Sequence, residues 1–304
     1  MDGGGSGQEH LERWLGEAGS WIEAELSAWI DGRTGWPATL REATAYALLG
    51  GGKRLRPALV RLFCEAEGGD LARALPPALA IEMVHTYSLV HDDLPCMDDD
   101  DLRRGRPTCH KVYGEAMAVL VGDTLLTEAF GVLGAFRVQG ESPGVGAELV
   151  EVLARAAGAC GMVGGQVLDL TLAGSRASAE EVRAVHRAKT AALIAAACEM
   201  GALAGGGDAA RRGGARAFGV GLGLGFQAID DVLDVVGDAG TLGKTPGKDE
   251  ALDRATSVAA FGLEGARREA RRHAQDAREA ARRLGFDEGD LPFAFVDRLL
   301  ERER

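Results

Sequence analysis

The most constraining feature of this sequence is a run of carboxylates directly after an apolar stretch, in SLVHDDLPCMDDDDLRRGRP, Ser88 to Pro107. The segment holds six aspartates and three arginines. Six like charges cannot neutralise one another, and a protein core cannot take them up. The segment is therefore either a solvated acidic loop or a site that holds something strongly positive.

The spacing of apolar residues predicts an all-α protein. They recur at intervals of three and four through most of the chain, among Ala, Leu, Glu and Arg, which favour helices. Ser178, with Glu181 three residues later, has the pattern of a helix capping box. We expect residues 1–10 to form a flexible tail and residues 11–304 a single domain, a bundle of about ten helices. Turn-forming segments separate the periodic blocks, at 31–37, 67–70, 137–146, 173–178, 205–208 and 237–248.

Composition narrows the class of protein and its compartment. A net charge of −12 argues against nucleic acid or an anionic membrane as the main partner. The five cysteines are scattered, which fits reduced thiols better than a disulfide framework. The N-terminus lacks the pattern of a signal peptide, and apolar runs such as 191–198 are too short to span a bilayer. We expect a soluble, cytoplasmic protein with no membrane span.

Two glycine-rich stretches resemble nucleotide-binding loops only superficially. LGGGKRLRP at 49–57 lacks the spacing of a P-loop, and GVGLGLGFQ at 219–227 follows no predicted strand. We interpret the second as a helix whose glycines permit close packing. Lys53, Arg54 and Arg56 could bind a phosphate group, although these residues alone favour an ordinary surface patch.

The acidic segment has the composition of a metal site. Asp92 and Asp93 follow the apolar helix predicted over 78–91, and Pro95 disturbs the helix so that Asp98 can turn back beside them. Carboxylate oxygens at a helix end suit a hard divalent cation, Mg²⁺ above all.

A second acidic cluster lies far downstream, in GFQAIDDVLDVVGD. Asp230 and Asp234 are four residues apart and share a helix face, with Asp231 alongside. Like charges at that spacing repel, so a half-buried helix face needs a cation to carry them.

Cations follow each acidic cluster: Arg103 and Arg104 after the first, Lys244 and Lys248 after the second. Mg²⁺ is usually shared between carboxylates and substrate phosphates. A pyrophosphate held between the clusters would become a good leaving group, and a dry helical cavity would protect the resulting carbocation. The pattern is suited to ionising an allylic pyrophosphate.

From about Leu11 to its end, the chain resembles the trans-isoprenyl diphosphate synthases, the polyprenyl synthetase family, and most closely the bacterial farnesyl and geranylgeranyl diphosphate synthases. The resemblance implies the all-α isoprenoid synthase fold, a central cavity faced by both Asp-rich motifs, and a homodimer. The stretches that carry it are GGKRLRP (51–57), 82–108, GMVGGQVLDL (161–170), HRAKTAALI (186–194) and 225–249.

The resemblance also implies a role for each matching residue. Six aspartates would hold three Mg²⁺ ions: Asp92, Asp93, Asp98, Asp230, Asp231 and Asp234. The cations on the allylic pyrophosphate would be Arg103, Lys189 and Lys244, with Lys248 near them. The pocket for isopentenyl diphosphate would be formed by Lys53, Arg56, His85 and Arg104. The oxygens facing the carbocation would belong to Thr190 and Gln227.

The implied reaction is ionisation of the allylic substrate, attack by the isopentenyl double bond, and proton loss to the departing pyrophosphate. The arginines of the first motif are then expected to clamp substrate and not to pair with the aspartates. One departure from the family lies in DRATSVAAFG (253–262), where Arg254 keeps the usual charge but the usual Tyr-Pro pair is missing. Arg302 matches weakly an arginine that the family carries near the isopentenyl site.

The resemblance makes Tyr87 and Ser88 the residues that set product length. Helical rise places Tyr87 about 7.5 Å below the first aspartate, although helical-wheel geometry favours Ser88 as the inward residue. An aromatic floor at Tyr87 predicts the C15 product, farnesyl diphosphate. The alternative is C20, to which Met117 and other deep residues could shift the product. A class I terpene cyclase, a head-to-head synthase and a non-catalytic regulatory subunit are disfavoured, because both aspartate motifs and GGKRLRP are present.

Overall fold

The computed structural model describes residues 4–137, 144–174, 177–236 and 255–301. The predicted all-α class is confirmed, since the described strands are only the two-residue β1 and β2. The elements are α1 (Gly4–Asp31), α2 (Ala38–Leu48), α3 (Leu55–Ala66), α4 (Leu71–Asp92), β1 (Leu102–Arg103), β2 (Arg106–Pro107), α5 (Cys109–Tyr113), α6 (Glu115–Gly134), α7 (Val145–Ala157), α8 (Met162–Leu172), α9 (Ala179–Val185), the π-helix η1 (His186–Ala191), α10 (Ala192–Gly205), α11 (Ala209–Val236), α14 (Ser257–Phe261), α15 (Leu263–Arg283) and α16 (Leu291–Glu301).

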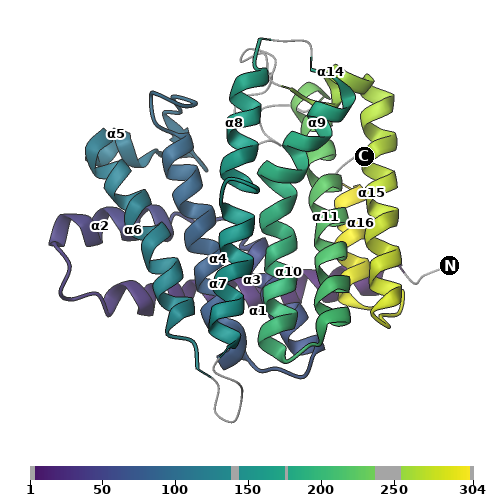
Figure 1. Ribbon diagram of the computed structural model, residues 1–304, viewed down its shortest axis with the longest axis horizontal. Coiled ribbons are helices and arrows are strands. Elements are labelled where there is room, and N and C mark those ends of the chain that lie inside the picture. Colours follow the sequence, from purple (N-terminus) through teal and green to yellow (C-terminus); the bar gives the residue numbers. More distant parts are fainter. Residues whose placement is uncertain (1–3, 138–143, 175–176, 237–254, 302–304) are drawn as a thin grey trace.

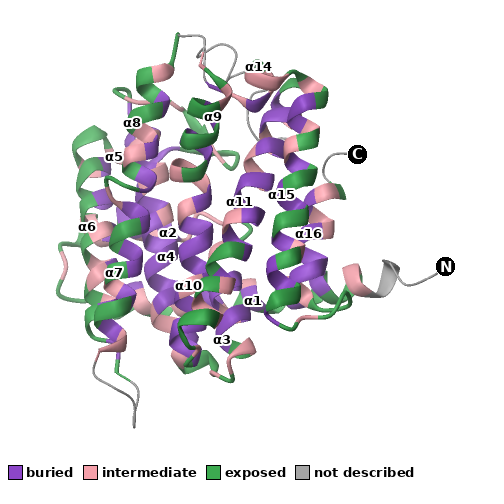
Figure 2. Cartoon of the chain, turned by 45° about the vertical axis from the view of Figure 1, so that its right-hand side comes forward, coloured by how far each residue is buried: buried purple, intermediate pink, exposed green. Residues whose placement is uncertain are grey.

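Helix α10 lies at the centre of the bundle. Nearly all its residues are buried, because α3, α4, α7 and α11 pack around it. Figure 1 shows α10, α11 and α15 upright next to one another, with α1 running crosswise to them. In Figure 2 the colour of buried residues covers most of α10 and the middle of α4, whereas α6 and α7 alternate between buried and exposed residues.

The N-terminal segment differs from the prediction of a tail over residues 1–10. Helix α1 already begins at Gly4, before the expected start at Leu11. Its inner face buries Leu11, Trp14, Ala18 and Ile22, at helical spacing, against α3, α4 and α16. One buried cluster runs from Leu11 to Leu299, which is consistent with a single domain.

Local sequence signals are reproduced where they can be checked. Helix α1 ends at Asp31 and α2 begins at Ala38, as the break at 31–37 predicts. The capping box is confirmed: the N–H of Glu181 donates to the Ser178 hydroxyl at 3.3 Å, and the N–H of Ser178 donates to the Glu181 carboxylate at 2.7 Å.

The glycines of α11 are packing contacts, as expected. A Cβ on Gly219 would lie 2.6 Å from the Cα of Ala195 on α10, and one on Gly223 would lie 2.7 Å from the Cα of Ala191 on η1. A Cβ on Gly221 would meet the backbone nitrogen of Ala277 on α15 at 2.8 Å. The missing side chains therefore let α11 approach helices on both sides.

Two helical segments are long and apolar enough to cross a membrane by length and composition alone: Glu115–Gly134 and Ala179–Gly205. In the second, 72% of the apolar window is buried inside the bundle, as in a core helix. In the first the buried share is only 33%, so α6 leaves apolar side chains on the surface.

We predict that Gly223→Ala lowers the free energy of unfolding by about 1–3 kcal/mol, because the new methyl group must push α11 away from η1. The matched control is Gly213→Ala in the same helix, where nothing lies within 4 Å of the added Cβ. That change should stabilise by roughly 0.5–1 kcal/mol, since alanine favours a helix over glycine. Urea denaturation midpoints measure both, and a shift in the same direction for both variants would contradict the packing role.

Candidate active site

The first aspartate cluster forms where α4 ends. Asp92 is the last residue of the helix and Asp93 is its C-cap. The N–H of Asp98 donates to the carbonyl of Asp92 at 2.8 Å, and the N–H of Asp100 donates to that of Asp93 at 3.2 Å. The chain after Pro95 therefore turns back on the helix end, as predicted, and brings Asp98 beside the pair.

Arg103, on β1, pairs with this cluster. Its Nε donates to Oδ1 of buried Asp93 at 2.9 Å, its Nη2 also contacts that oxygen, and Nη2 lies 3.2 Å from Asp100 Oδ2. Burial raises the pKa of Asp93, although Arg103 opposes the shift. The expectation that the arginines do not pair with the aspartates is therefore wrong for Arg103, which compensates the buried carboxylate.

The second cluster lies in the last turns of α11, where Asp231 and Asp234 are buried and Asp230 is half-buried. Asp231 is a hydrogen-bond hub. Its Oδ1 accepts from Gln227 Nε2 at 2.8 Å, and its Oδ2 accepts from the N–H of Ser257 at 2.6 Å and lies 3.4 Å from His186 Nε2. One carboxylate thus joins α11, α14 and η1.

The π-helix η1 places two further candidates. The wider turns of a π-helix are rare in proteins as a whole, but where they occur they are often found at functional sites. Thr190 donates its hydroxyl proton to Gln227 Oε1 at 2.6 Å, and Lys189 Nζ lies 2.6 Å from Asp169 Oδ2. A Cβ on Gly165 would lie 2.3 Å from the backbone nitrogen of Lys189, so this glycine lets α8 approach η1.

Three residues of the site were missed from the sequence. Asp169 is a buried carboxylate in the otherwise apolar α8, and that contrast was the available signal. Ser257 contributes only its backbone N–H, which no pattern reveals. Gln166 lines the cavity described below and is also half-buried.

A group of cations gathers beside the first cluster. Arg104 fits against Gly52, where an added Cβ would lie 2.5 Å from the guanidinium carbon. Burial lowers the pKa of Arg56, and Arg104 lowers it further. Burial followed by the charges of Arg56 and Arg104 also brings the pKa of His85 well below its usual value. Cations packed this closely favour the binding of an anion.

Arg54 has a different role from its neighbours. It is buried, with Nη1 2.5 Å from Glu82 Oε1, Nε 2.6 Å from Glu23 Oε1 and Nη2 2.7 Å from the carbonyl of Leu48. Its φ of 46° lies in the left-handed region at the start of α3. The surface-patch interpretation is therefore wrong for Arg54, which fixes the start of α3 between Lys53 and Arg56.

A cavity of about 440 Å³ is lined by several of the candidates, among them Arg56, Asp92 and Lys189. Nε of Arg56 and Nε2 of Gln166 are buried and have no hydrogen-bond partner among the residues the structure describes. Both Tyr87 and Ser88 line the cavity, whereas Met117 is not among the described lining residues. Those lining residues are Arg56, His85, Tyr87, Ser88, Leu89, His91, Asp92, Met97, Met162, Val163, Gln166, Val167, Leu170, Lys189 and Thr190.

Some candidates lie elsewhere. Lys53 lines a second cavity, of about 550 Å³, between α1, α11 and α16. Lys244, Lys248, Arg254 and Arg302 lie outside the described residues. The described part of the atypical 253–262 stretch contains Thr256, which caps α14, and Ser257, whose N–H holds Asp231.

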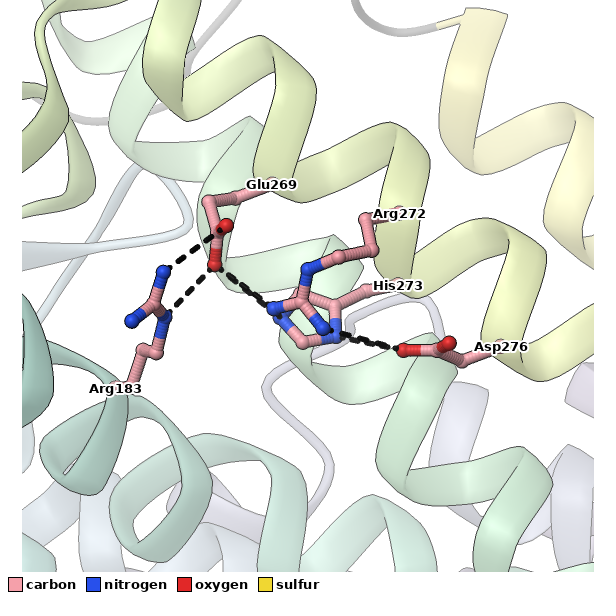
Figure 3. Close-up of polar contacts among 5 residues, drawn as sticks. All are labelled: Arg183, Glu269, Arg272, His273 and Asp276. Carbon is pink, nitrogen blue, oxygen red and sulfur yellow. Dashed lines mark hydrogen bonds and ion pairs between the residues drawn. The ribbon is translucent and has the colours of Figure 1, made fainter.

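Helix α9, which leads into η1, is fixed from outside by the cluster in Figure 3. Arg183 donates to both oxygens of Glu269 on α15, at 3.0 and 3.2 Å, and its guanidinium lies 4.8 Å from the ring centre of Phe261. Hydrogen bonding to Arg183 lowers the pKa of Glu269 to about 2. On the other side of Glu269, His273 lies between that residue and Asp276.

No three carboxylate, imidazole or thiol groups among the described residues are placed to hold an ion by themselves. Mg²⁺ is commonly bound by one or two carboxylates together with substrate phosphates. The carboxylate oxygens of the two aspartate clusters are suitable ligands for such an ion. The buried N–H groups of Arg56 and Gln166, beside the first cluster, could donate hydrogen bonds to a diphosphate that shares it.

A sequence profile of the polyprenyl synthetase family matches residues 37–284. The chain belongs to this family. It is 43% identical over 286 residues to a farnesyl diphosphate synthase of Geobacillus stearothermophilus, covering 94% of this chain and 96% of the relative. It is 46% identical over 254 residues to geranylgeranyl pyrophosphate synthase 9 of Arabidopsis thaliana, covering 83% and 70% of the two chains.

Solved structures of the family confirm the isoprenoid synthase fold. A geranyltransferase of Legionella pneumophila superimposes with a TM-score of 0.83 at 33% identity, covering 97% of this chain and 98% of that chain. An FPP/GFPP synthase of Zymomonas mobilis gives a TM-score of 0.79 at 33% identity, covering 98% of both chains.

We predict that inorganic pyrophosphate raises the pKa of His85. Burial and neighbouring cations favour the neutral ring, and an anion among them favours the imidazolium form. Histidine NMR titrations with and without pyrophosphate measure the shift, and His85→Gln assigns the signal. His273, whose pKa is lowered by burial and then by Arg272, is the internal control. A shift of equal size at both histidines, or none at His85, would contradict anion binding here.

Proposed function

We propose that this protein is a short-chain trans-isoprenyl diphosphate synthase. It condenses isopentenyl diphosphate with dimethylallyl and geranyl diphosphates and releases mainly farnesyl diphosphate. The observation that carries the proposal is the cavity: Asp92 and Lys189 lie among its lining, Arg56 and His85 add positive charge, and its apolar walls include the aromatic ring of Tyr87.

Charge compensation prepares the allylic substrate for ionisation. Mg²⁺, three ions in the proposed site, would neutralise the diphosphate and make it a better leaving group. Asp92, Asp98, Asp230 and Asp234 would hold these ions, while Asp93 and Asp231 would position Arg103 and Gln227, with which they form hydrogen bonds. Arg103 and Lys189, with Lys244 and Lys248, complete the binding of the diphosphate.

The hydrogen-bond chain from Asp231 prepares the cavity for the carbocation. Asp231 accepts from the Gln227 amide nitrogen, so the amide oxygen faces Thr190 and accepts its hydroxyl proton. The oxygen lone pairs of Thr190 then remain for the positive carbon, and they need no reorientation during the reaction.

Isopentenyl diphosphate binds beside the allylic substrate, in the cation group of Arg56, His85 and Arg104, with Lys53 contributing from the segment directly before α3. Its double bond attacks the cationic carbon and forms the new carbon–carbon bond. The adduct loses a proton to the departing diphosphate, which restores a double bond and gives an allylic diphosphate five carbons longer.

A geranylgeranyl diphosphate synthase is the second candidate, and similarity to the Arabidopsis enzyme favours it. Tyr87 favours C15, because a buried aromatic ring leaves less depth for the hydrocarbon tail. A terpene cyclase or a regulatory subunit is disfavoured, since the cation group offers a place for a second diphosphate.

We further propose a homodimer that works in the cytoplasm. Helix α6 and the preceding α5 expose Val112, Val119 and Leu120, at 46%, 40% and 52%, and a second copy of the chain would cover these side chains. The five cysteines are all free, as in a reducing compartment.

Product analysis tests the activity. With labelled isopentenyl diphosphate, Mg²⁺ and a dimethylallyl or geranyl primer, the expected main product is C15, and a chelator should abolish elongation. Tyr87→Ala should move the product to C20 or longer by deepening the cavity. Failure to elongate any primer would contradict the synthase, whereas C20 from the unchanged protein would contradict only the C15 assignment.

The dimer is tested by Leu120→Glu, which places a charge in the proposed apolar interface and should weaken association by roughly tenfold or more. Sedimentation velocity measures the dissociation constant. Leu71→Glu is the matched control, because Leu71 is 39% exposed at the distant start of α4. Equal association in both variants would locate the contact elsewhere.

A further inference from the structure

We propose that His91, held in place through Gly122, is a second specificity-determining residue that limits product length together with Tyr87. The proposal rests on the synthase function above and adds to it a side chain on the wall of the hydrocarbon cavity and the glycine that makes room for it.

His91 lies in the last turn of α4, one turn beyond Tyr87 and directly before Asp92. It lines the same cavity as Tyr87. The two rings meet edge to face, with centroids 5.8 Å apart and planes at 77°. A hydrocarbon tail that runs from Asp92 toward Tyr87 therefore passes the imidazole, which closes this side of the cavity together with the Tyr87 ring.

The imidazole is fixed by a hydrogen bond to α6. Its Nε2 lies 3.1 Å from the carbonyl oxygen of Val119. Because a carbonyl oxygen only accepts, Nε2 carries the proton and donates it. The ring of His91 thus bridges α4 and α6 at the edge of the cavity.

Gly122 on α6 leaves the space that this ring occupies. A Cβ there would lie 1.9 Å from His91 Nε2, 2.4 Å from Cδ2 and 2.6 Å from Cε1, which is shorter than any tolerable contact. At Gly131 in the same helix, nothing lies within 4 Å of the place that a Cβ would take. Glycine is less favourable than alanine in a helix interior, so a buried glycine under a ring indicates a steric requirement.

The position of the ring can be changed in two opposite directions. His91→Ala removes the ring and opens the cavity toward α6. Gly122→Ala keeps the ring but displaces it from α6, and the free direction is into the cavity. The first change should lengthen the product and the second should shorten it.

Product distributions test this with geranyl and dimethylallyl primers. His91→Ala should raise the C20:C15 product ratio by roughly tenfold or more. An apolar pocket whose size changes by about one methylene group discriminates between substrates by about that factor. Gly122→Ala should lower the kcat/KM for geranyl relative to dimethylallyl diphosphate by a similar factor and accumulate C10. Gly131→Ala is the matched control and should leave both ratios unchanged.

The double variant His91→Ala with Gly122→Ala separates a ring clash from general damage to α6. Without the ring the new methyl group has room, so its products should match those of His91→Ala alone. His91→Phe keeps the ring volume without the Val119 hydrogen bond and should retain C15, which isolates bulk from hydrogen bonding.

Calorimetric binding of inert geranyl and farnesyl thiodiphosphates provides a readout that does not need turnover. His91→Ala should raise the affinity for the farnesyl analogue relative to the geranyl analogue, and Gly122→Ala should lower it. Unchanged product and affinity ratios in both single variants would overturn the proposal. Absence of elongation by the unchanged protein would instead contradict the proposed function, and the affinity ratios would still decide the role of His91.

Discussion

The hydrogen bonds accepted by the carboxylate of Asp231 hold together the end of the bundle that carries the active site. This carboxylate accepts from Gln227 and from the N–H of Ser257 and lies beside His186, so it joins α11, α14 and η1 at one point. A buried carboxylate needs such donors, because an uncompensated charge would cost several kcal/mol. The carboxylate in turn orients the Gln227 amide, and through it the Thr190 hydroxyl. Stability and chemistry therefore use the same atoms here.

Close helix packing makes that junction possible. The glycines of α11 let it approach α10, η1 and α15 to within backbone contact, and Gly165 does the same for α8 against η1. These helices then present Asp169, Lys189 and Thr190 close to one another. The network around Arg183 and Glu269 adds a brace to α9 from the outside (Figure 3).

The helical fold and the acidic motifs can be predicted from the sequence, because both are local patterns of residues. Helical period, the break at 31–37, the capping box at Ser178 and the reversal of the chain after Pro95 each depend on a few adjacent residues. The start of α1 differs from the expectation because a glycine-rich beginning is typical of a tail, yet the helix extends back from the buried Leu11 to Gly4. The site assignments themselves came from resemblance to a family as much as from spacing.

What the sequence could not supply are contacts between distant segments. The packing of the bundle, and not spacing along the chain, determines which of these residues pair: Asp169 with Lys189, Ser257 with Asp231, and Arg103 with Asp93. The same holds for His91, whose neighbour Gly122 has no sequence pattern of its own. A lone histidine before an aspartate pair is ambiguous by itself. Because a glycine of α6 lies under its ring, the space available at that point depends on both positions.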